Sequence, residues 1–243
     1  MAAKKAPRKK TNLTAGATTA GNQGEFPSAF SLFGPSWEGL QQNLVELVFI
    51  FVVPTLVILF LSLAAGLTST NSDGSQHVSG GLGILTGAFL VVSVALLGPA
   101  IVHIQLKSSL NQKATYASAW ATSKKYWWRF LVLTFMLGIT ILVGFILLIV
   151  PGVIFIKRYF LFHYALIDED LGLVESMKRS NQLSKDRSMT VYSVLGVEVL
   201  ISIVGSILRV IPVLGQVATL LFQVTYFCAP AIRYQQLKAT LKA

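Results

Sequence analysis

Residues 107–129, KSSLNQKATYASAWATSKKYWWR, contain five basic residues and no acidic one, and they lie between two long uncharged apolar runs. The runs 82–106 and 130–150 are each long enough to reach the roughly 20 residues that a helix needs to cross hydrocarbon. A short, strongly basic segment between two such helices is typical of a cytoplasmic loop, because Lys and Arg are retained on that side of the membrane. This segment therefore predicts a membrane protein and gives its orientation.

Four further apolar runs lie outside this central part, at 44–67, 153–167, 189–211 and 213–232, and the fourth run of the chain, 153–167, is short. Together they predict about six transmembrane helices. Of the 20 Lys and Arg residues, 17 fall in the four segments that six spans would place on one side. We therefore expect an all-α polytopic membrane helix bundle with short interfacial helices, in a prokaryotic plasma membrane, with both termini cytoplasmic.

The composition excludes an ordinary soluble domain. The chain has 12% charged and 53% hydrophobic residues, whereas a soluble domain carries about a quarter charged residues. The net charge of +10 is divided among four segments and does not line one groove, so we do not expect nucleic acid as a partner. The expected partners are the lipid bilayer and its anionic headgroups. One cysteine, Cys228, allows no intramolecular disulfide.

Three regions are predicted along the chain. Residues 1–26 are a disordered basic cytoplasmic tail, because they contain no apolar run that could repay the entropy of ordering. Residues 27–238 form the six-helix transmembrane domain, and 239–243 the cytoplasmic C-terminal end. The loop at 68–81 lacks Lys and Arg and is expected outside the cell.

A weak internal repeat divides the transmembrane region into three units of interfacial helix plus hairpin. Pro99, Gln105 and Lys107 recur, with the residues beside them, as Pro230, Gln236 and Lys238. Three further pairs stand at equal spacing before the odd-numbered spans: Ser36-Trp37 with Gln41-Gln42, Ala119-Trp120 with Lys124-Lys125, and Ser176-Met177 with Asn181-Gln182.

Glu198 is the sharpest candidate for a functional residue, because an ionisable group near mid-bilayer is costly unless it has a role or a partner. It is either a proton or cation site, or a neutral acid hydrogen-bonded to Gln216 or Gln223 on the sixth span. The structural interpretation is favoured. Lys157 and Arg158 complete the candidate intramembrane polar site. They are expected near the outer end of the fourth span, where their long side chains reach the interface and at most one turns inward toward Glu198 or Tyr192.

No metal, cofactor or catalytic motif is recognised. The acidic cluster Asp168-Glu169-Asp170 precedes the helix that begins near Gly172, and its plainest role is electrostatic. On that helix we expect Glu175 to pair with Lys178 and Arg179. We expect its apolar residues to face the membrane: Leu173, Val174, Met177 and Leu183.

The stretch 147–187 resembles the membrane domain found in some glycerophosphoryl diester phosphodiesterases and in related uncharacterised bacterial membrane proteins. The matching features are Pro151-Gly152, Lys157-Arg158-Tyr159, Asp168, Leu173, the run from Glu175 to Ser180, and Leu183-Ser184-Lys185. Ser176-Met177 replaces the usual Ala-Leu, and Asp186 stands where a Gly usually ends the helix. The resemblance implies a membrane module without the soluble catalytic barrel, and therefore no phosphodiesterase activity.

The sequence thus predicts an integral membrane protein without catalytic activity of its own. We expect a membrane scaffold or envelope-associated protein that contacts lipids or other membrane proteins. The alternative is a small-solute, ion or lipid transporter that uses intramembrane Glu198 and Lys157/Arg158. The two differ in geometry, because transport requires these groups to face one water-accessible cavity.

Overall fold

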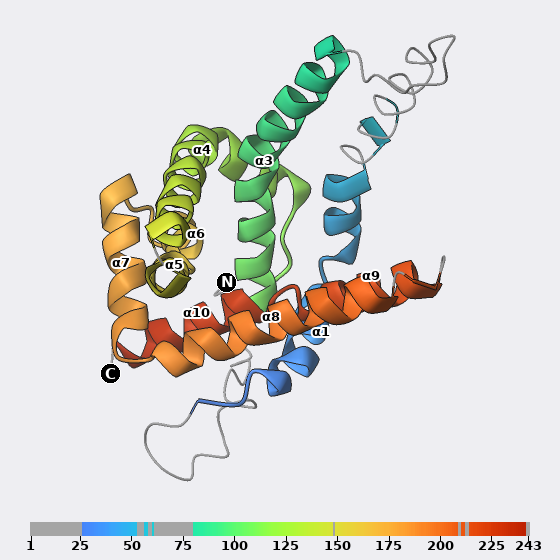
Figure 1. Cartoon of the computed structure of the whole chain (residues 1–243). Coiled ribbons are helices and arrows are strands. Elements are labelled where there is room, and N and C mark those ends of the chain that lie inside the picture. Colours follow the sequence, from blue (N-terminus) through green and yellow to red (C-terminus); the bar gives the residue numbers. More distant parts are fainter. Residues whose placement is uncertain are drawn as a thin grey trace, which may run out of the picture.

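The computed structural model describes residues 26–52, 56–57, 60, 80–147, 149–208, 210–211 and 214–241. Every regular element among them is helical, so the all-α prediction is confirmed for this part of the chain (Figure 1). The elements are η1 (Phe30–Leu32), α1 (Phe33–Gln41), helical residues 44–52, α3 (Gly80–Ser109), α4 (Tyr116–Leu147), α5 (Ile149–Tyr159), α6 (Phe162–Asp168), α7 (Leu173–Lys185), α8 (Ser188–Leu208), α9 (Leu214–Tyr226) and α10 (Ala229–Thr240).

Three of the described helices are long and apolar enough to cross a membrane. These segments are Ile84–Ser109 in α3, Tyr116–Gly144 in α4 and Ser188–Leu208 in α8. At a rise of 1.5 Å per residue, the 21 residues of α8 extend about 31 Å, close to the thickness of the hydrocarbon layer. Half of the first predicted span, with nearly all of the predicted outer loop and basic tail, lies outside the described residues.

The fourth and sixth predicted spans are not single helices, and that expectation was wrong. The fourth run divides into α5 and α6 at Leu161, and the sixth into α9 and α10 at Cys228. Each break leaves backbone groups without helical partners, and serine side chains bind them. The N–H of Leu161 donates to Ser180 Oγ at 3.2 Å, and that of Cys228 donates to Ser36 Oγ at 2.9 Å. Proline near the start of α10 fits the second break, since a first turn needs no N–H partner.

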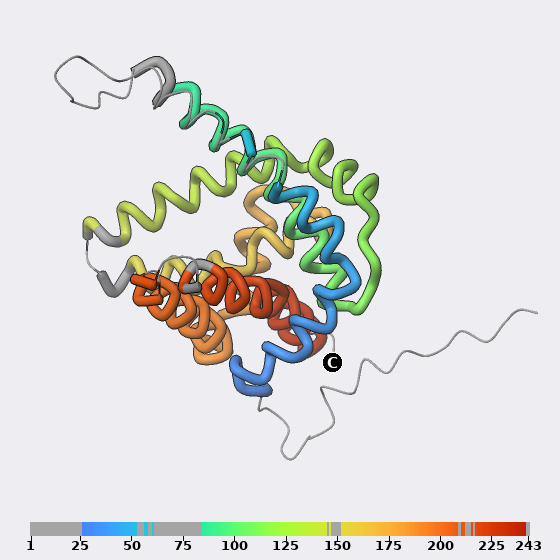
Figure 2. Tube along the Cα trace, turned by 90° about the vertical axis from the view of Figure 1, so that its right-hand side faces the viewer, coloured from blue at the N-terminus to red at the C-terminus, as the bar shows by residue number. Residues whose placement is uncertain are grey.

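The helices form three antiparallel hairpins that are joined at one end and diverge toward the other (Figures 1 and 2). Residues 44–52 pair with α3, α4 pairs with α5, and α8 pairs with α9. The joined end, which we call the base, also contains α1, α6, α7 and α10. In Figure 2 the three divergent ends lie toward the left of the view and the base lies toward the right.

Side-chain burial differs between the base and the divergent ends. At the base the core is closed: Leu161, Ala165 and Tyr234 are 0% exposed. At the divergent ends, apolar side chains are exposed. One example from each hairpin is Ile84 (74% exposed), Ile146 (74%) and Ile207 (65%). Exposed apolar surface on this scale marks an interaction site for a membrane or another protein.

Glycine residues allow close helix contacts in the hairpins and at the base. A methyl group at Gly205 of α8 would lie 2.6 Å from Thr219 Cγ2 of α9, and one at Gly98 of α3 would lie 2.3 Å from the Phe130 ring of α4. One at Gly39 of α1 would lie 2.2 Å from the Ser108 carbonyl oxygen. Small residues at helix crossings are typical of membrane proteins, where close packing holds helices together.

The burial pattern agrees with the predicted threefold repeat. Ser36 of α1, Ala119 of α4 and Ser176 of α7 stand at equivalent positions and are 0%, 1% and 0% exposed. The next two equivalent positions of each unit are buried as well: Leu40 and Asn43, Ser123 and Tyr126, and Ser180 and Leu183. The three units therefore turn the same face toward the base.

Candidate functional site

Glu198 lies on the side of α8 that faces an open hollow of about 520 Å³. The described residues that line the hollow are all on α8, and Ser202 and Ser206 follow Glu198 at four-residue spacing, so the three form a polar stripe. Both serine hydroxyls donate to backbone carbonyls one turn back, Ser202 Oγ to Glu198 O at 2.9 Å and Ser206 Oγ to Ser202 O at 2.8 Å. The Glu198 carboxyl makes no hydrogen bond or ion pair with any described residue.

Lys157 and Arg158 do not share this hollow. They occupy the last turn of α5 and bind groups of the base: Lys157 Nζ donates to Ser188 Oγ at 2.8 Å, and Arg158 Nε donates to Asn181 Oδ1 at 2.7 Å. The expectation that they reach the outer interface was wrong, because α5 ends after 11 residues and places its basic turn against α7 and α8.

The two glutamines of the candidate site are not brought to Glu198 by any contact of the described residues. Gln223 is exposed on α9 and makes no hydrogen bond to Glu198. The side chain of Gln216 is not among those that the structure describes. Of the four predicted site residues whose side chains the structure describes, no two from different helices are brought together.

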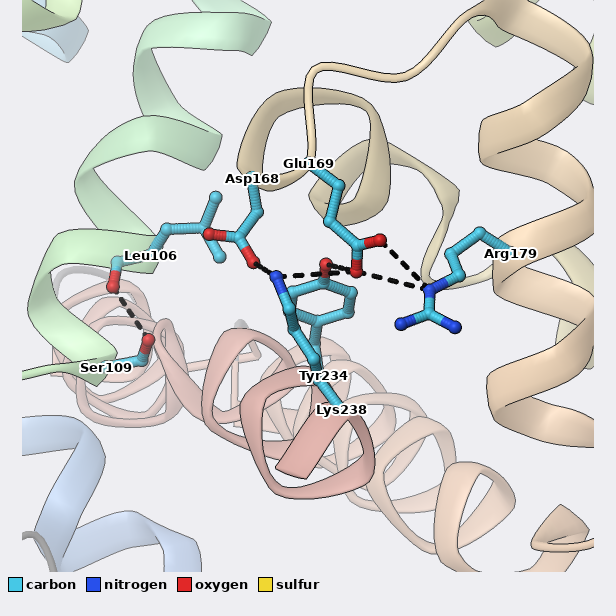
Figure 3. A network of polar contacts seen from close by, with 7 residues as sticks. All are labelled: Leu106, Ser109, Asp168, Glu169, Arg179, Tyr234 and Lys238. Carbon is cyan, nitrogen blue, oxygen red and sulfur yellow. Dashed lines mark hydrogen bonds and ion pairs between the residues drawn. The ribbon is translucent and has the colours of Figure 1, made fainter. Parts of the chain in front are cut away.

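Polar contacts are concentrated at the base, around the acidic turn Asp168-Glu169-Asp170 that follows α6 (Figure 3). Lys238 Nζ of α10 lies 2.5 Å from Asp168 Oδ2 and 3.4 Å from Glu169 Oε1. Arg179 Nε of α7 lies 3.1 Å from Glu169 Oε2. The turn therefore joins α7 to α10.

Asp170 extends the same cluster to α4. It has a φ of 49°, a left-handed conformation that Asp tolerates better than most residues, and this turns its carboxylate toward α4. Lys125 Nζ lies 2.6 Å from Asp170 Oδ2, and the Tyr126 hydroxyl donates to Oδ1 at 2.5 Å. Hydrogen bonds from Lys125 and Tyr126 lower the pKa of the Asp170 carboxyl.

The pKa of Glu169 is also lowered. Burial alone would raise it, but the hydrogen bond from the Tyr234 hydroxyl, at 3.0 Å, and the charges of Lys238 and Arg179 outweigh that effect. A carboxylate that remains charged and is bound by two cations and a hydroxyl acts as a structural link, which agrees with the electrostatic role expected of this cluster.

The amphipathic helix α7 packs in the opposite sense to the prediction. Its apolar residues Leu173, Met177 and Leu183 contact the core of the base, and only Val174, 58% exposed, remains outside. Arg179 pairs with Glu169 and leaves Glu175 without an ion pair among the described residues. The membrane-facing assignment failed because an apolar stripe has the same sequence pattern whether it contacts lipid or protein.

Neutral buried side chains that sequence reasoning missed connect the three units. Gln105 Nε2 of α3 donates to the Phe227 carbonyl at 2.8 Å and accepts from the Tyr164 hydroxyl at 3.0 Å. Asn43, 0% exposed, donates to Ser108 Oγ and accepts from the Ala114 N–H. The intramembrane candidates were chosen as ionisable residues and the neutral partners expected for Glu198, so Gln105 had stood out only as part of the repeat.

Arg233, 1% exposed on α10, holds the segment that precedes α1 against the base. Its Nη2 donates to the Pro27 carbonyl at 2.9 Å, and its guanidinium lies 5.7 Å from the centre of the Phe26 ring. Arg187 lies 4.9 Å from the same ring. The Tyr226 hydroxyl adds a bond to the Ala29 carbonyl at 3.2 Å.

The chemistry of the described residues is therefore that of association between helices. No group of three or more His, Cys, Asp or Glu side chains within the described ranges could hold a metal ion. No family model, no curated protein and no solved structure matches this chain.

Proposed function

We propose that the chain is a multi-pass scaffold or envelope-associated protein of a prokaryotic plasma membrane, without catalytic activity, that contacts lipids or other membrane proteins. In this proposal it crosses the bilayer about six times, as three hairpins, with both termini in the cytoplasm. The observation that carries it is the contrast within each hairpin between a buried base and a bare apolar end.

The polar chemistry of the base supports a structural role. The described acidic residues of the turn after α6 are each bound to a basic residue, and Lys157 and Arg158 are bound by neutral partners. Groups that are occupied in this way join helices and are not presented to a solute. The resemblance to the phosphodiesterase membrane domain stays a prediction and is compatible with a membrane module of this kind.

The transport alternative has one observation in its favour, the position of Glu198 on an open hollow. It also requires Lys157 or Arg158 to face the same space, and their contacts lie elsewhere. Purified protein in liposomes with an imposed proton or cation gradient tests this alternative. Scaffolding predicts gradient decay no faster than in empty liposomes, whereas decay that Glu198→Gln abolishes would support transport.

Single-cysteine labelling tests the membrane topology. With Cys228 replaced by Ser, Lys178→Cys and Ser75→Cys each provide one thiol in a predicted cytoplasmic and a predicted outer segment. A membrane-impermeant maleimide should label Ser75→Cys in intact cells, and Lys178→Cys only after the membrane is opened. Labelling of Lys178→Cys in intact cells would overturn the proposed orientation.

A further inference from the structure

The first four turns of α4 carry an exposed face of mixed aromatic and basic character. Tyr116, Trp120, Lys124 and Trp128 follow one another at four-residue steps, and Trp127 lies three residues after Lys124, so all five lie on one side of the helix. Trp120, Trp127 and Trp128 are 38%, 42% and 59% exposed, and Lys124 is also exposed. We call these five residues the aromatic-basic stripe. Large exposed aromatic side chains beside a cation require a partner that offers both an apolar and an anionic part.

Lys124, the cation of the stripe, is free of ion pairs to the described residues, whereas its neighbours Lys125 and Arg129 are paired. Lys125 and Arg129 lie 2.6 Å and 3.8 Å from the Asp170 carboxylate, which holds them against the base. Lys124 forms no ion pair with any residue that the structure describes, and its ammonium lies 5.8 Å from the centre of the Trp120 ring. Of these three cations, Lys124 is the one without an ion pair to the described residues and is therefore accessible to a ligand.

The place of the stripe along α4 indicates what that ligand is. The 32 residues of α4 extend about 48 Å, well beyond the roughly 30 Å of the hydrocarbon layer. Beyond Phe130 the exposed side chains become apolar, with Phe135, Leu142 and Ile146 at 69%, 60% and 74% exposure. The stripe therefore continues a lipid-facing surface on the basic side of the helix, where Trp and Tyr prefer the level of the headgroups.

We propose that the aromatic-basic stripe binds the headgroups of anionic phospholipids in the cytoplasmic leaflet. Trp127 and Trp128 mark the edge of the hydrocarbon, Trp120 lies at headgroup level, and Lys124 is the cation that selects negative charge. This inference rests on the membrane location proposed above and adds the lipid class and the residues that recognise it.

Tryptophan fluorescence tests the inference, because three of the four Trp residues belong to the stripe. In a Trp37→Phe background, emission comes from the stripe alone. The protein is reconstituted in phosphatidylcholine vesicles that contain an equal fraction of either brominated phosphatidylglycerol or brominated phosphatidylcholine, since bromine quenches tryptophan at short range. One available lysine near an anionic lipid should raise the relative binding constant for the brominated phosphatidylglycerol about three- to fivefold.

Three variants test whether the charge of Lys124 causes the preference for the anionic lipid. Lys124→Gln should reduce the preference to about one, and Lys124→Arg should retain it, because each keeps the exposed helix face and only the first removes the charge. Lys178→Gln is the matched control: Lys178 is exposed on α7, has no ion pair with the described residues, and loses the same unit of charge. It should retain the preference.

The outcomes separate the two proposals. Equal quenching by the two brominated lipids in the parent protein, an unchanged preference in Lys124→Gln, or an equal loss in Lys178→Gln would overturn the headgroup site while leaving the membrane location intact. Absence of quenching by either lipid would overturn the membrane location itself.

Discussion

The hydroxyl of Tyr164 donates a hydrogen bond to the side-chain oxygen of Gln105 at 3.0 Å, and the amide group of the same Gln105 donates to the Phe227 carbonyl at 2.8 Å. These residues belong to α6, α3 and the turn between α9 and α10, so one amide side chain connects segments that follow or form the second arms of the three hairpins. Both Tyr164 and Gln105 are buried, and loss of one partner leaves the other without water to replace it.

Tyr164→Phe should lower the free energy of unfolding by about 1–3 kcal/mol, because the Gln105 oxygen would remain buried without its donor. Denaturant unfolding in detergent, followed by circular dichroism, measures the change. Tyr116→Phe is the control, since Tyr116 is 55% exposed and its hydroxyl makes no hydrogen bond to the described residues. Equal stability of the two variants would contradict a role of this bond in joining the hairpins.

Gly205→Ala should destabilise the third hairpin by about 1–3 kcal/mol, because the added methyl group would overlap Thr219 on α9. Gly196→Ala lies on the same helix, with nothing within 4 Å of the added carbon. It should be neutral or stabilising by up to about 1 kcal/mol, through helix propensity. Thermal unfolding of the pair in one detergent gives the comparison, and a Gly205→Ala protein as stable as Gly196→Ala would show that α8 and α9 are less close than described.

Acid should weaken the base through Glu169. The folded state lowers the pKa of this carboxyl below its ordinary value of 4.5, so its contribution to stability is present above about pH 4.5 and is lost as the pH falls through the lower folded value. Glu169→Gln should therefore be less stable than the parent at pH 7 and should lose less stability between pH 7 and pH 4. Glu175→Gln, on an exposed carboxylate of α7, should follow the parent curve. Parallel curves for the parent and Glu169→Gln would refute the link.

Phe26→Ala should loosen the N-terminal segment from the base. The ring lies against the guanidinium groups of Arg187 and Arg233, and each such contact contributes about 0.5–1 kcal/mol. Limited proteolysis should cut residues 26–32 faster in Phe26→Ala than in the parent. Phe30→Ala removes a ring that is 63% exposed and should leave the rate unchanged. If the two variants were cut at one rate, the two arginines would not be what holds the segment.

The sequence was sufficient for the helical class and for the three long apolar helices, because both depend on local pattern. The repeat stays a prediction with which the burial pattern agrees. The sequence was insufficient for the breaks in the fourth and sixth runs. Both runs are predominantly apolar, and at the breaks Ser180 and Ser36, which are distant in sequence, bind the backbone N–H groups of Leu161 and Cys228. Hydropathy contains no information about such tertiary partners.

The candidate site was harder still to predict. Glu198 stood out because an intramembrane charge is costly, and the same reasoning added Lys157 and Arg158 as the other ionisable groups within the apolar runs. Their contacts could not be predicted, because proximity depends on where α5 ends and on which way each helix turns. Besides the ion pairs of Asp168, Glu169 and Asp170, contacts of the base come from neutral Gln105, Asn43 and Tyr164, whose importance arises only from their burial.

The divergence of the three hairpins has a mechanical consequence. If the arms lie in a bilayer, acyl chains or the helix of a neighbouring molecule must cover their exposed apolar side chains. A change in bilayer thickness or lateral pressure would then act on arms that meet at the base. The ion pairs of Glu169 with Arg179 and of Asp168 with Lys238 would oppose a separation of the helices that they join.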